Sequence, residues 1–220
     1  MNLFFNLKTD YNNKLAMSIN KLSYKKPSKR LDDDDCMDES SEDTYQLHVY
    51  DNKIVFHGSV TEKSCFELIK AINNVSYTLT RYSNFAEIPL ELHINSGGGD
   101  LFAALSVIET INRCKHDVIT VCEGQACSAA ALIFLAGSVR RMGKNSYIMI
   151  HEIRSVAWGK FSELQDDMKN NKKLMKDLKN YLSERTNEKM RTDKLSKFLK
   201  HDILWGYKKC LKYGIATQIW

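Results

Sequence analysis

The spacing of apolar and polar residues after about residue 45 predicts short strands alternating with helices. Short apolar stretches end near Ile94, Val121 and Ile150, as is typical of buried strands. Between them, apolar residues recur at three- and four-residue intervals up to Ile111 and Ala136, which indicates helices. This βαβ order predicts an α/β fold with a mainly parallel sheet and covering helices.

The first elements of this domain are less regular. Residues 48–56 have a strand-like pattern interrupted at Asp51-Asn52, where we expect a turn. Thr61, with Ser64 three positions later, is expected to open a helix. The apolar stripe of that helix consists of Phe66, Ile69 and Ile72. Residues 73–87 are polar and aromatic, and we expect them to form a surface connection.

A long amphipathic helix is predicted over residues 160–185, because apolar residues recur there at helical spacing and the opposite face is rich in Lys and Asp. Its apolar positions are Phe161, Leu164, Met168, Leu174, Met175, Leu178 and Leu182. Two interpretations stay open. The helix lies on its own domain, or it projects and a partner chain buries its stripe.

Residues 1–44 differ in composition from the rest of the chain. They are rich in Lys and Asn as far as Arg30, and an acidic stretch then runs from Asp32 to Asp43. Opposite charge blocks with few apolar residues predict a disordered tail over 1–44, preceding one domain over 45–220. We expect a cytoplasmic protein; the alternative is an organelle presequence within residues 1–30.

Composition narrows the function classes for the 220 residues. The net charge of +5 is spread out, with no basic patch interleaved with aromatic residues, so we expect no nucleic-acid partner. No apolar run approaches membrane-spanning length, so no membrane association is expected. The six cysteines lack CxxC or Cys/His metal spacing, and we interpret them as reduced thiols. We expect neither a metal nor a cofactor.

Candidate chemistry centres on residues 123–134, EGQACSAAALIF, where an apolar strand leads through a tight turn into an apolar helix. Ser128 stands where this helix begins, near unpaired backbone N–H groups and the positive end of the helix dipole. Its hydroxyl is either an N-cap or a nucleophile whose oxyanion product those amides stabilise. Cys127 could be reactive as well, but a small packing residue is the simpler interpretation.

Two further stretches bear on this choice. Residues 94–100, INSGGGD, place three glycines at a strand-to-helix turn, where their N–H groups can hold an anion. Neither a Lys-Ser/Thr after the glycines nor a GxGxxG pattern is present, so a peptide oxyanion fits better than a phosphate. Residues 147–152, YIMIHE, end a strand in His151, which is a structural hydrogen-bonding residue or a general base.

Together these motifs resemble the ClpP family, the proteolytic subunits of ATP-dependent Clp proteases, over roughly residues 54–220. The family's N-S-P-G-G stands here as residues 95–99, its G-Q-A-A-S-M-G-A as residues 124–131, and its M-I-H-Q-P as residues 149–153. The interval from Gly99 to Ser128 equals the family's. Asp202 precedes a Tyr213-Gly214 segment at the family's spacing for the third triad member. Asp193 lies nearby, and an exposed helix-capping Asp is the alternative interpretation of either residue.

The resemblance implies a role for each motif residue. Ser128 would be the nucleophile, His151 the general base and Asp202 its orienting carboxylate, with the Gly99 and Ala129 N–H groups as the oxyanion hole. It also implies a crotonase-like α/β fold of repeated β-β-α units in which residues 160–185 form a projecting handle helix. Heptameric rings, possibly stacked in pairs, an AAA+ unfoldase partner and polypeptide substrates are further expectations from the family.

The leading hypothesis is therefore a serine endopeptidase that cleaves unfolded polypeptides or peptides. One alternative is a catalytically weak structural or regulatory subunit of the same type, and another is an acyl-CoA enzyme of the crotonase fold. The chain departs from the family at Gly97 and Ile153, where the family has proline, and at Lys200-His201, where many members have Glu-Arg.

Overall fold

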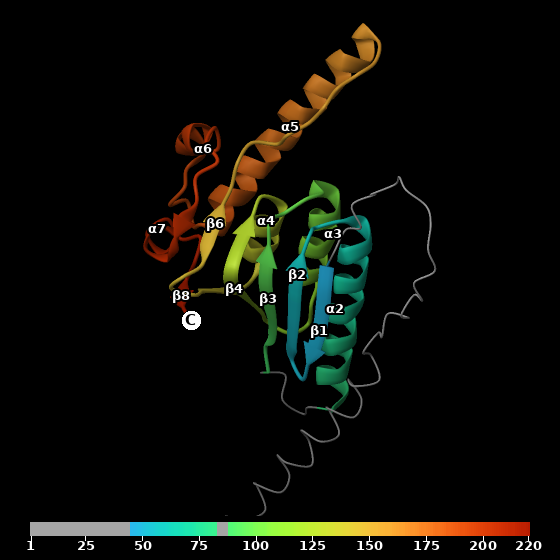
Figure 1. The fold of residues 1–220 in the computed structure, drawn as a ribbon, viewed down its shortest axis with the longest axis vertical. Helices are drawn as coiled ribbons and strands as arrows, with labels where there is room; N and C mark the ends of the chain where they lie inside the picture. Colours follow the sequence, from blue (N-terminus) through green and yellow to red (C-terminus); the bar gives the residue numbers. More distant parts are fainter. Residues whose placement is uncertain (1–44, 83–87) are drawn as a thin grey trace, which may run out of the picture.

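The structure is a computed structural model that describes residues 45–82 and 88–220 (Figure 1). The predictions for residues 1–44 lie outside the described residues, and the domain boundary at residue 45 stays a prediction. In the described part, no helix is both long enough and apolar enough to cross a membrane.

One mainly parallel sheet organises the molecule, as the βαβ pattern predicts. Its strands are β1 (Tyr45–Tyr50), β2 (Lys53–Gly58), β3 (Leu90–Ser96), β4 (Val118–Cys127), β5 (Val139–Met142), β6 (Tyr147–Met149), β7 (Trp205–Gly206) and β8 (Gln218–Ile219). The order is β1-β2-β3-β4-β5-β8, while β6 pairs with the end of β4 and β7 pairs with β6. The β1–β2 and β6–β7 pairs are antiparallel, and the others are parallel.

Six helices complete the described fold: α2 (Glu62–Tyr82), α3 (Leu101–Asn112), α4 (Ala129–Ala136), α5 (Phe161–Arg185), α6 (Thr192–Phe198) and α7 (Tyr207–Lys212). Helices α2 and α3 lie side by side against the sheet, and α4 packs next to α3 (Figure 1). The core between them includes Leu68 and Ile72 from α2, Val107 from α3 and Phe134 from α4. Every residue of α4 is buried, so the helix that follows Ser128 is held on all sides.

The expected surface connection over residues 73–87 is wrong in its first part, because α2 continues to Tyr82. Its buried stripe runs from Leu68 through Ile72 to Val75, Thr78 and Leu79, at three- and four-residue spacing. Phe66, which the sequence pattern places in this stripe, is exposed instead. The polar residues between the buried positions face solvent, and they make the continuation of the helix hard to recognise in the sequence pattern. The turn expected at Asp51-Asn52 is confirmed, and Asp51 adopts a positive φ of 51° there.

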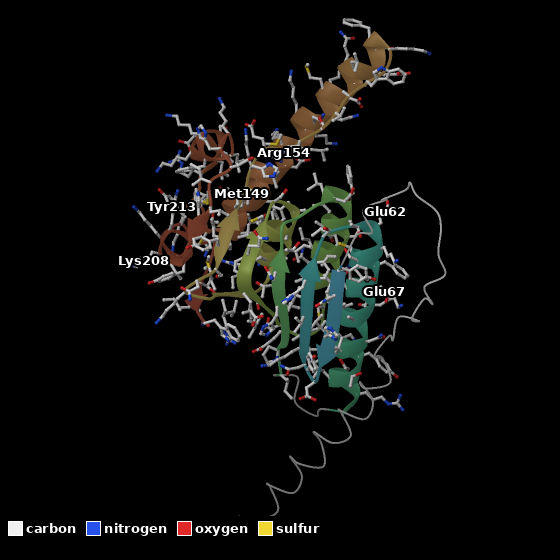
Figure 2. The ribbon with its side chains drawn as sticks, viewed as in Figure 1. Glu62, Glu67, Met149, Arg154, Lys208 and Tyr213 are labelled. Atoms are coloured by element: carbon white, nitrogen blue, oxygen red, sulfur yellow. The ribbon has the colours of Figure 1, made fainter. Side chains whose placement is uncertain are left out.

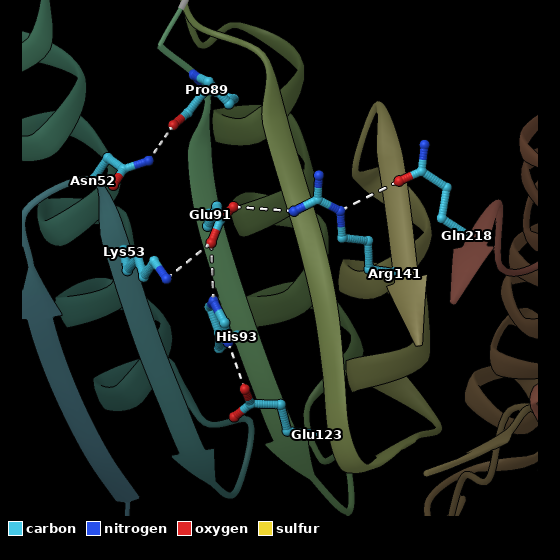
Figure 3. A network of polar contacts seen from close by, with 8 residues as sticks. All are labelled: Asn52, Lys53, Pro89, Glu91, His93, Glu123, Arg141 and Gln218. Carbon is cyan, nitrogen blue, oxygen red and sulfur yellow. Dashed lines mark hydrogen bonds and ion pairs between the residues drawn. The ribbon is translucent and has the colours of Figure 1, made fainter. Parts of the chain in front are cut away.

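The face of the sheet opposite α2 and α3 carries a network of charged side chains (Figure 3). Glu91 on β3 binds Arg141 of β5 at 3.1 Å and Lys53 of β2 at 3.5 Å. His93 on β3 lies with one ring nitrogen 2.7 Å from Glu123 of β4 and the other 3.4 Å from Glu91. These contacts tie four neighbouring strands together across a face that has no covering helix in the described structure.

Helix α5 projects away from the rest of the domain (Figure 1). Only Leu182, near its end, is buried, whereas Phe161 and Met168 are exposed. The prediction of a helix over 160–185 is confirmed. The interpretation that it lies on its own domain is wrong for its outer part, but its last turns pack against the core through Met175, Leu178, Tyr181 and Leu182. The segment between His151 and α5 runs alongside the helix and fully exposes Val156.

Candidate active site

Ser128 lies at the junction of β4 and α4, where strand backbone turns directly into helix. Its φ of 53° and ψ of −124° belong to a region that residues with a side chain rarely adopt. Such strain costs about 1–3 kcal/mol and persists only where the surroundings impose it. The Ser128 N–H donates to the Met149 carbonyl of β6 at 2.8 Å, which fixes this sharp turn.

The hydroxyl of Ser128 does not cap α4, because its side chain makes no capping hydrogen bond. The N-cap interpretation is therefore wrong for this residue. A strained, partly exposed serine whose side chain is free of a local backbone role is typical of a nucleophile at a strand-to-helix turn.

The glycine turn at the end of β3 lies directly over Ser128. A Cβ at Gly98 would stand 2.7 Å from the Ser128 Cβ and 3.2 Å from the Ala129 nitrogen. Gly98 has a φ of +99°, so a glycine is required both for backbone conformation and for the close approach. The backbone of Val60 holds this turn in place. The Val60 N–H donates to the Gly98 carbonyl at 2.9 Å, and the Val60 carbonyl accepts from the Asp100 N–H at 2.7 Å.

Two backbone N–H groups beside Ser128 are free. Neither the Gly99 N–H nor the Ala129 N–H has a hydrogen-bond partner within residues 45–82 and 88–220. Ala129 is the first residue of α4, whose leading N–H groups have no intrahelical acceptor. These groups are suited to hold a developing oxyanion, as the sequence predicts.

The sheet register brings His151 next to Ser128. Parallel pairing aligns Cys127 of β4 with Met149 of β6, and Ser128 and His151 follow these two residues. Neighbouring strands are about 4.8 Å apart, so the side chains of Ser128 and His151 project from adjacent strand ends. Half-buried His151 turns its Nδ1 toward the carbonyl oxygen of Glu152, its own neighbour in the chain.

Asp202 lies on the other side of β6. Strand β6 pairs with β7, and Asp202 comes three residues before β7 begins at Trp205. The Glu152 N–H also donates to the Leu199 carbonyl at 2.9 Å, which joins the segment after His151 to the loop that carries Asp202. Strands β4, β6 and β7 thus present Ser128, His151 and Asp202 in that order. Asp193, in contrast, lies in the first turn of α6 and pairs with Arg191.

The three side chains are not hydrogen-bonded to one another. Among the described residues, no hydrogen bond joins Ser128 to His151 or His151 to Asp202. The carboxylate of Asp202 forms an ion pair with Arg154 instead, and Figure 2 shows Arg154 on the segment alongside α5. No sequence motif points to Arg154. Its only signal is a positive charge three positions after His151.

Cys127 is confirmed as a packing residue. It is buried, and burial raises the pKa of its thiol above the ordinary value although a hydrogen bond with the Met149 backbone partly offsets this. A protonated, buried thiol is a poor nucleophile at neutral pH.

The sequence model of the Clp protease family matches residues 37–220. This chain belongs to the Clp protease family. It is 29% identical over 183 residues to an ATP-dependent Clp protease proteolytic subunit of Deinococcus radiodurans, a match that covers 82% of this chain and 86% of the relative. The mixed α/β architecture is that of the Clp protease fold, as the motifs predict.

Proposed function

We propose that this Clp protease family member is a serine endopeptidase that cleaves unfolded polypeptides or peptides at Ser128. The observation that carries the proposal is the strained Ser128, placed at the start of α4 beneath a glycine turn with two unpaired N–H groups beside it. This arrangement offers a nucleophile and an oxyanion site together, which acyl transfer requires.

In the proposed mechanism, Ser128 Oγ attacks the scissile carbonyl while His151 Nε2 takes its proton. The Gly99 and Ala129 N–H groups bind the oxyanion of the tetrahedral intermediate, and His151 then protonates the leaving amine. Water completes the cycle by hydrolysing the acyl-enzyme with the same base. Asp202 would accept a hydrogen bond from His151 Nδ1–H and stabilise the imidazolium.

Catalysis then requires two exchanges of hydrogen-bond partner. Asp202 must leave Arg154, and His151 Nδ1 must leave the Glu152 carbonyl. The first exchange is inexpensive, because the Arg154 and Asp202 side chains are 73% and 47% exposed. Exposed ion pairs of this kind contribute about 0–1 kcal/mol.

We also propose that α5 mediates self-association, with ring assembly and an AAA+ unfoldase partner as the family resemblance suggests. The outer part of α5 is acidic, with Glu163, Asp166 and Asp167, whereas the part nearer the domain carries the lysines Lys169, Lys172, Lys173 and Lys176. Two copies with antiparallel α5 helices would place acidic ends against basic middles. Exposed Phe161, Met168 and Trp158 would be buried in the same contact.

A peptidase assay on the full chain tests the mechanism. We expect cleavage of fluorogenic peptides to be lost in Ser128→Ala and retained in Cys127→Ala, the neighbouring matched control. Asp202→Asn should lower kcat by up to about 10⁴-fold, the cost of losing the orienting carboxylate in a serine triad, and Asp193→Asn should leave it unchanged. Cleavage that survives in Ser128→Ala would refute the proposal.

A second candidate is a catalytically weak structural subunit, which the disengaged Asp202 and His151 specifically favour. It predicts that the chain assembles but cleaves no peptide, even in the assembled particle. The acyl-CoA alternative has no observation of its own in this structure.

A further inference from the structure

The C-terminal end of α4 is held by side chains from elsewhere in the molecule. Tyr181 of α5 donates to the Leu132 carbonyl at 3.0 Å. Arg185, the last residue of α5, donates from Nε to Leu135 at 2.6 Å and from Nη2 to Ala136 and Gly137 at 2.9 and 2.7 Å. The Leu135, Ala136 and Gly137 carbonyls are among the groups that a helix end leaves without intrahelical partners, and here Arg185 supplies the donors.

A second arginine completes the contact. Arg140 of β5 is buried and donates to the Gly137 carbonyl at 3.1 Å and to the carbonyl of Arg185 itself at 3.1 Å. Burial, together with the nearby charge of Arg185, lowers the pKa of Arg140 to about 10, which still leaves it charged at neutral pH. The negative dipole ends of α4 and α5 therefore meet at two guanidinium groups, each of which offsets part of their repulsion.

The opposite end of α4 carries the reacting groups. The helix has eight residues, all buried, and is therefore about 12 Å long. A short, fully packed helix moves as one piece, so a change at its C-terminal end reaches the Ala129 N–H and Ser128 at its start. The described contacts thus connect the projecting helix to the nucleophile through Arg185.

We propose that Arg185 and Arg140 are positioning residues that fix α4, and with it Ser128 and the oxyanion-binding N–H of Ala129, relative to α5. A change in how α5 packs against α4 would therefore change the position of Ser128. The proposal rests on the proposed function of Ser128.

The test compares Arg185→Ala and Arg185→Lys with Lys179→Ala on the same helix, where Lys179 bonds Ser196 of α6 and makes no contact with α4. Peptide kcat and KM, the rate of fluorophosphonate labelling and the particle mass are measured for each full-length protein. We expect Arg185→Ala to lower kcat and labelling about ten- to a hundredfold with KM and mass unchanged, as expected for a misplacement of about 1 Å. Millimolar guanidinium should restore part of the rate, and Lys179→Ala should behave as wild type.

The outcomes separate the two claims. A wild-type protein that Ser128-directed probes do not label refutes the proposed function itself. Labelled wild type with equal kcat in Arg185→Ala refutes only the positioning role, as does a change confined to KM. If Arg185→Ala fails to fold, Arg185→Lys decides, because it keeps the charge but cannot reach three carbonyls. Wild-type kcat in that variant overturns the proposal.

Discussion

At the scale of single residues, Arg154 pairs with the carboxylate that the proposed mechanism assigns to His151. The ion pair of Arg154 with Asp202 joins positions 48 residues apart and occupies the carboxylate that a triad requires. Removing the guanidinium frees that carboxylate for the imidazole. Since an exposed ion pair is worth at most about 1 kcal/mol, the gain is bounded at about fivefold.

We therefore predict that Arg154→Ala raises peptide kcat about two- to fivefold. Arg191→Ala removes another exposed arginine that pairs with an aspartate, Asp193, and should leave kcat unchanged. Steady-state kinetics on both variants make the comparison. A fall in kcat for Arg154→Ala would show that Arg154 supports Asp202 instead of occupying it.

The carboxyl group of Glu91 makes the stability of the fold depend on pH. Burial alone would raise the pKa of its carboxyl, but the hydrogen bond with His93 and the charges of Lys53 and Arg141 bring it below the ordinary value. A lowered pKa in the folded state means that the charged carboxylate stabilises the fold above the unfolded-state pKa. This contribution is lost as the pH falls through the folded-state pKa.

Glu91→Gln should accordingly lower the free energy of unfolding by about 1 kcal/mol at pH 7, and the difference from wild type should shrink below about pH 4. Urea denaturation at pH 7 and pH 3.5 measures it. Glu67→Gln, at an exposed pair with Lys70, is the control and should change little at either pH. An equal loss at both pH values for Glu91→Gln would contradict the assigned electrostatic role.

The candidate site residues could be proposed from the sequence because their motifs are local. Gly99, Ser128 and His151 each stand at the end of a strand, and the parallel sheet brings those ends together. Arg154 could not be found in this way. Its pairing with Asp202 depends on how the segment after His151 runs between α5 and α6, which no local pattern specifies.

At the scale of elements, the turn between β3 and α3 provides a matched pair of glycines. A Cβ at Gly98 would meet the Cys127 carbonyl oxygen at 2.5 Å, whereas a Cβ at Gly97 would meet nothing within 4 Å. Gly97 also lacks the positive φ of Gly98. Substitutions at Gly97 and Gly98 therefore distinguish the need for close approach to Ser128 from a general need for a flexible turn.

We predict that Gly98→Ala destabilises the protein by about 1–3 kcal/mol and abolishes peptide cleavage, while Gly97→Ala keeps both near wild type. Thermal unfolding and the peptidase assay measure the two effects. Wild-type cleavage in Gly98→Ala would show that the turn does not need to approach Ser128 so closely.

Element boundaries were predicted well where the apolar pattern was strong and poorly where polar residues interrupted it. Helix α5 begins one residue after the predicted start, at Phe161. The end of α2 was missed because Val75 and Leu79 are separated by polar residues, so their common face is visible only against the packed core.

At the scale of the whole molecule, the projecting shape supports the proposal that α5 binds a second copy of the chain. A projecting helix with exposed Phe161 and Met168 does not gain enough burial from its own domain. Periodicity alone could not distinguish a projecting helix from a packed one, since both bury one stripe. Buried Leu182, with the partly buried Met175, Leu178 and Tyr181, shows which part of α5 packs against the core.

The charge segregation along α5 predicts an assembly that weakens with salt. Raising the salt from about 0.1 to 1 M shortens the Debye length from about 10 to about 3 Å and should lower the mass measured by light scattering. Asp166→Lys with Asp167→Lys should lower it at low salt as well. The control is Glu62→Lys with Glu67→Lys, which makes the same charge change on α2, remote from α5 (Figure 2). This control should leave the measured mass unchanged. A mass insensitive to salt and to both pairs would contradict the charge-matched contact.

The assignment of Ser128 as the nucleophile is tested most directly by locating the adduct of a fluorophosphonate probe by mass spectrometry of the digested full-length protein. We expect one modified peptide, with the phosphonyl group on Ser128, and no modification in Ser128→Ala. A protein modified on another residue, or left unmodified in its assembled form, would contradict the assignment of Ser128 as the nucleophile.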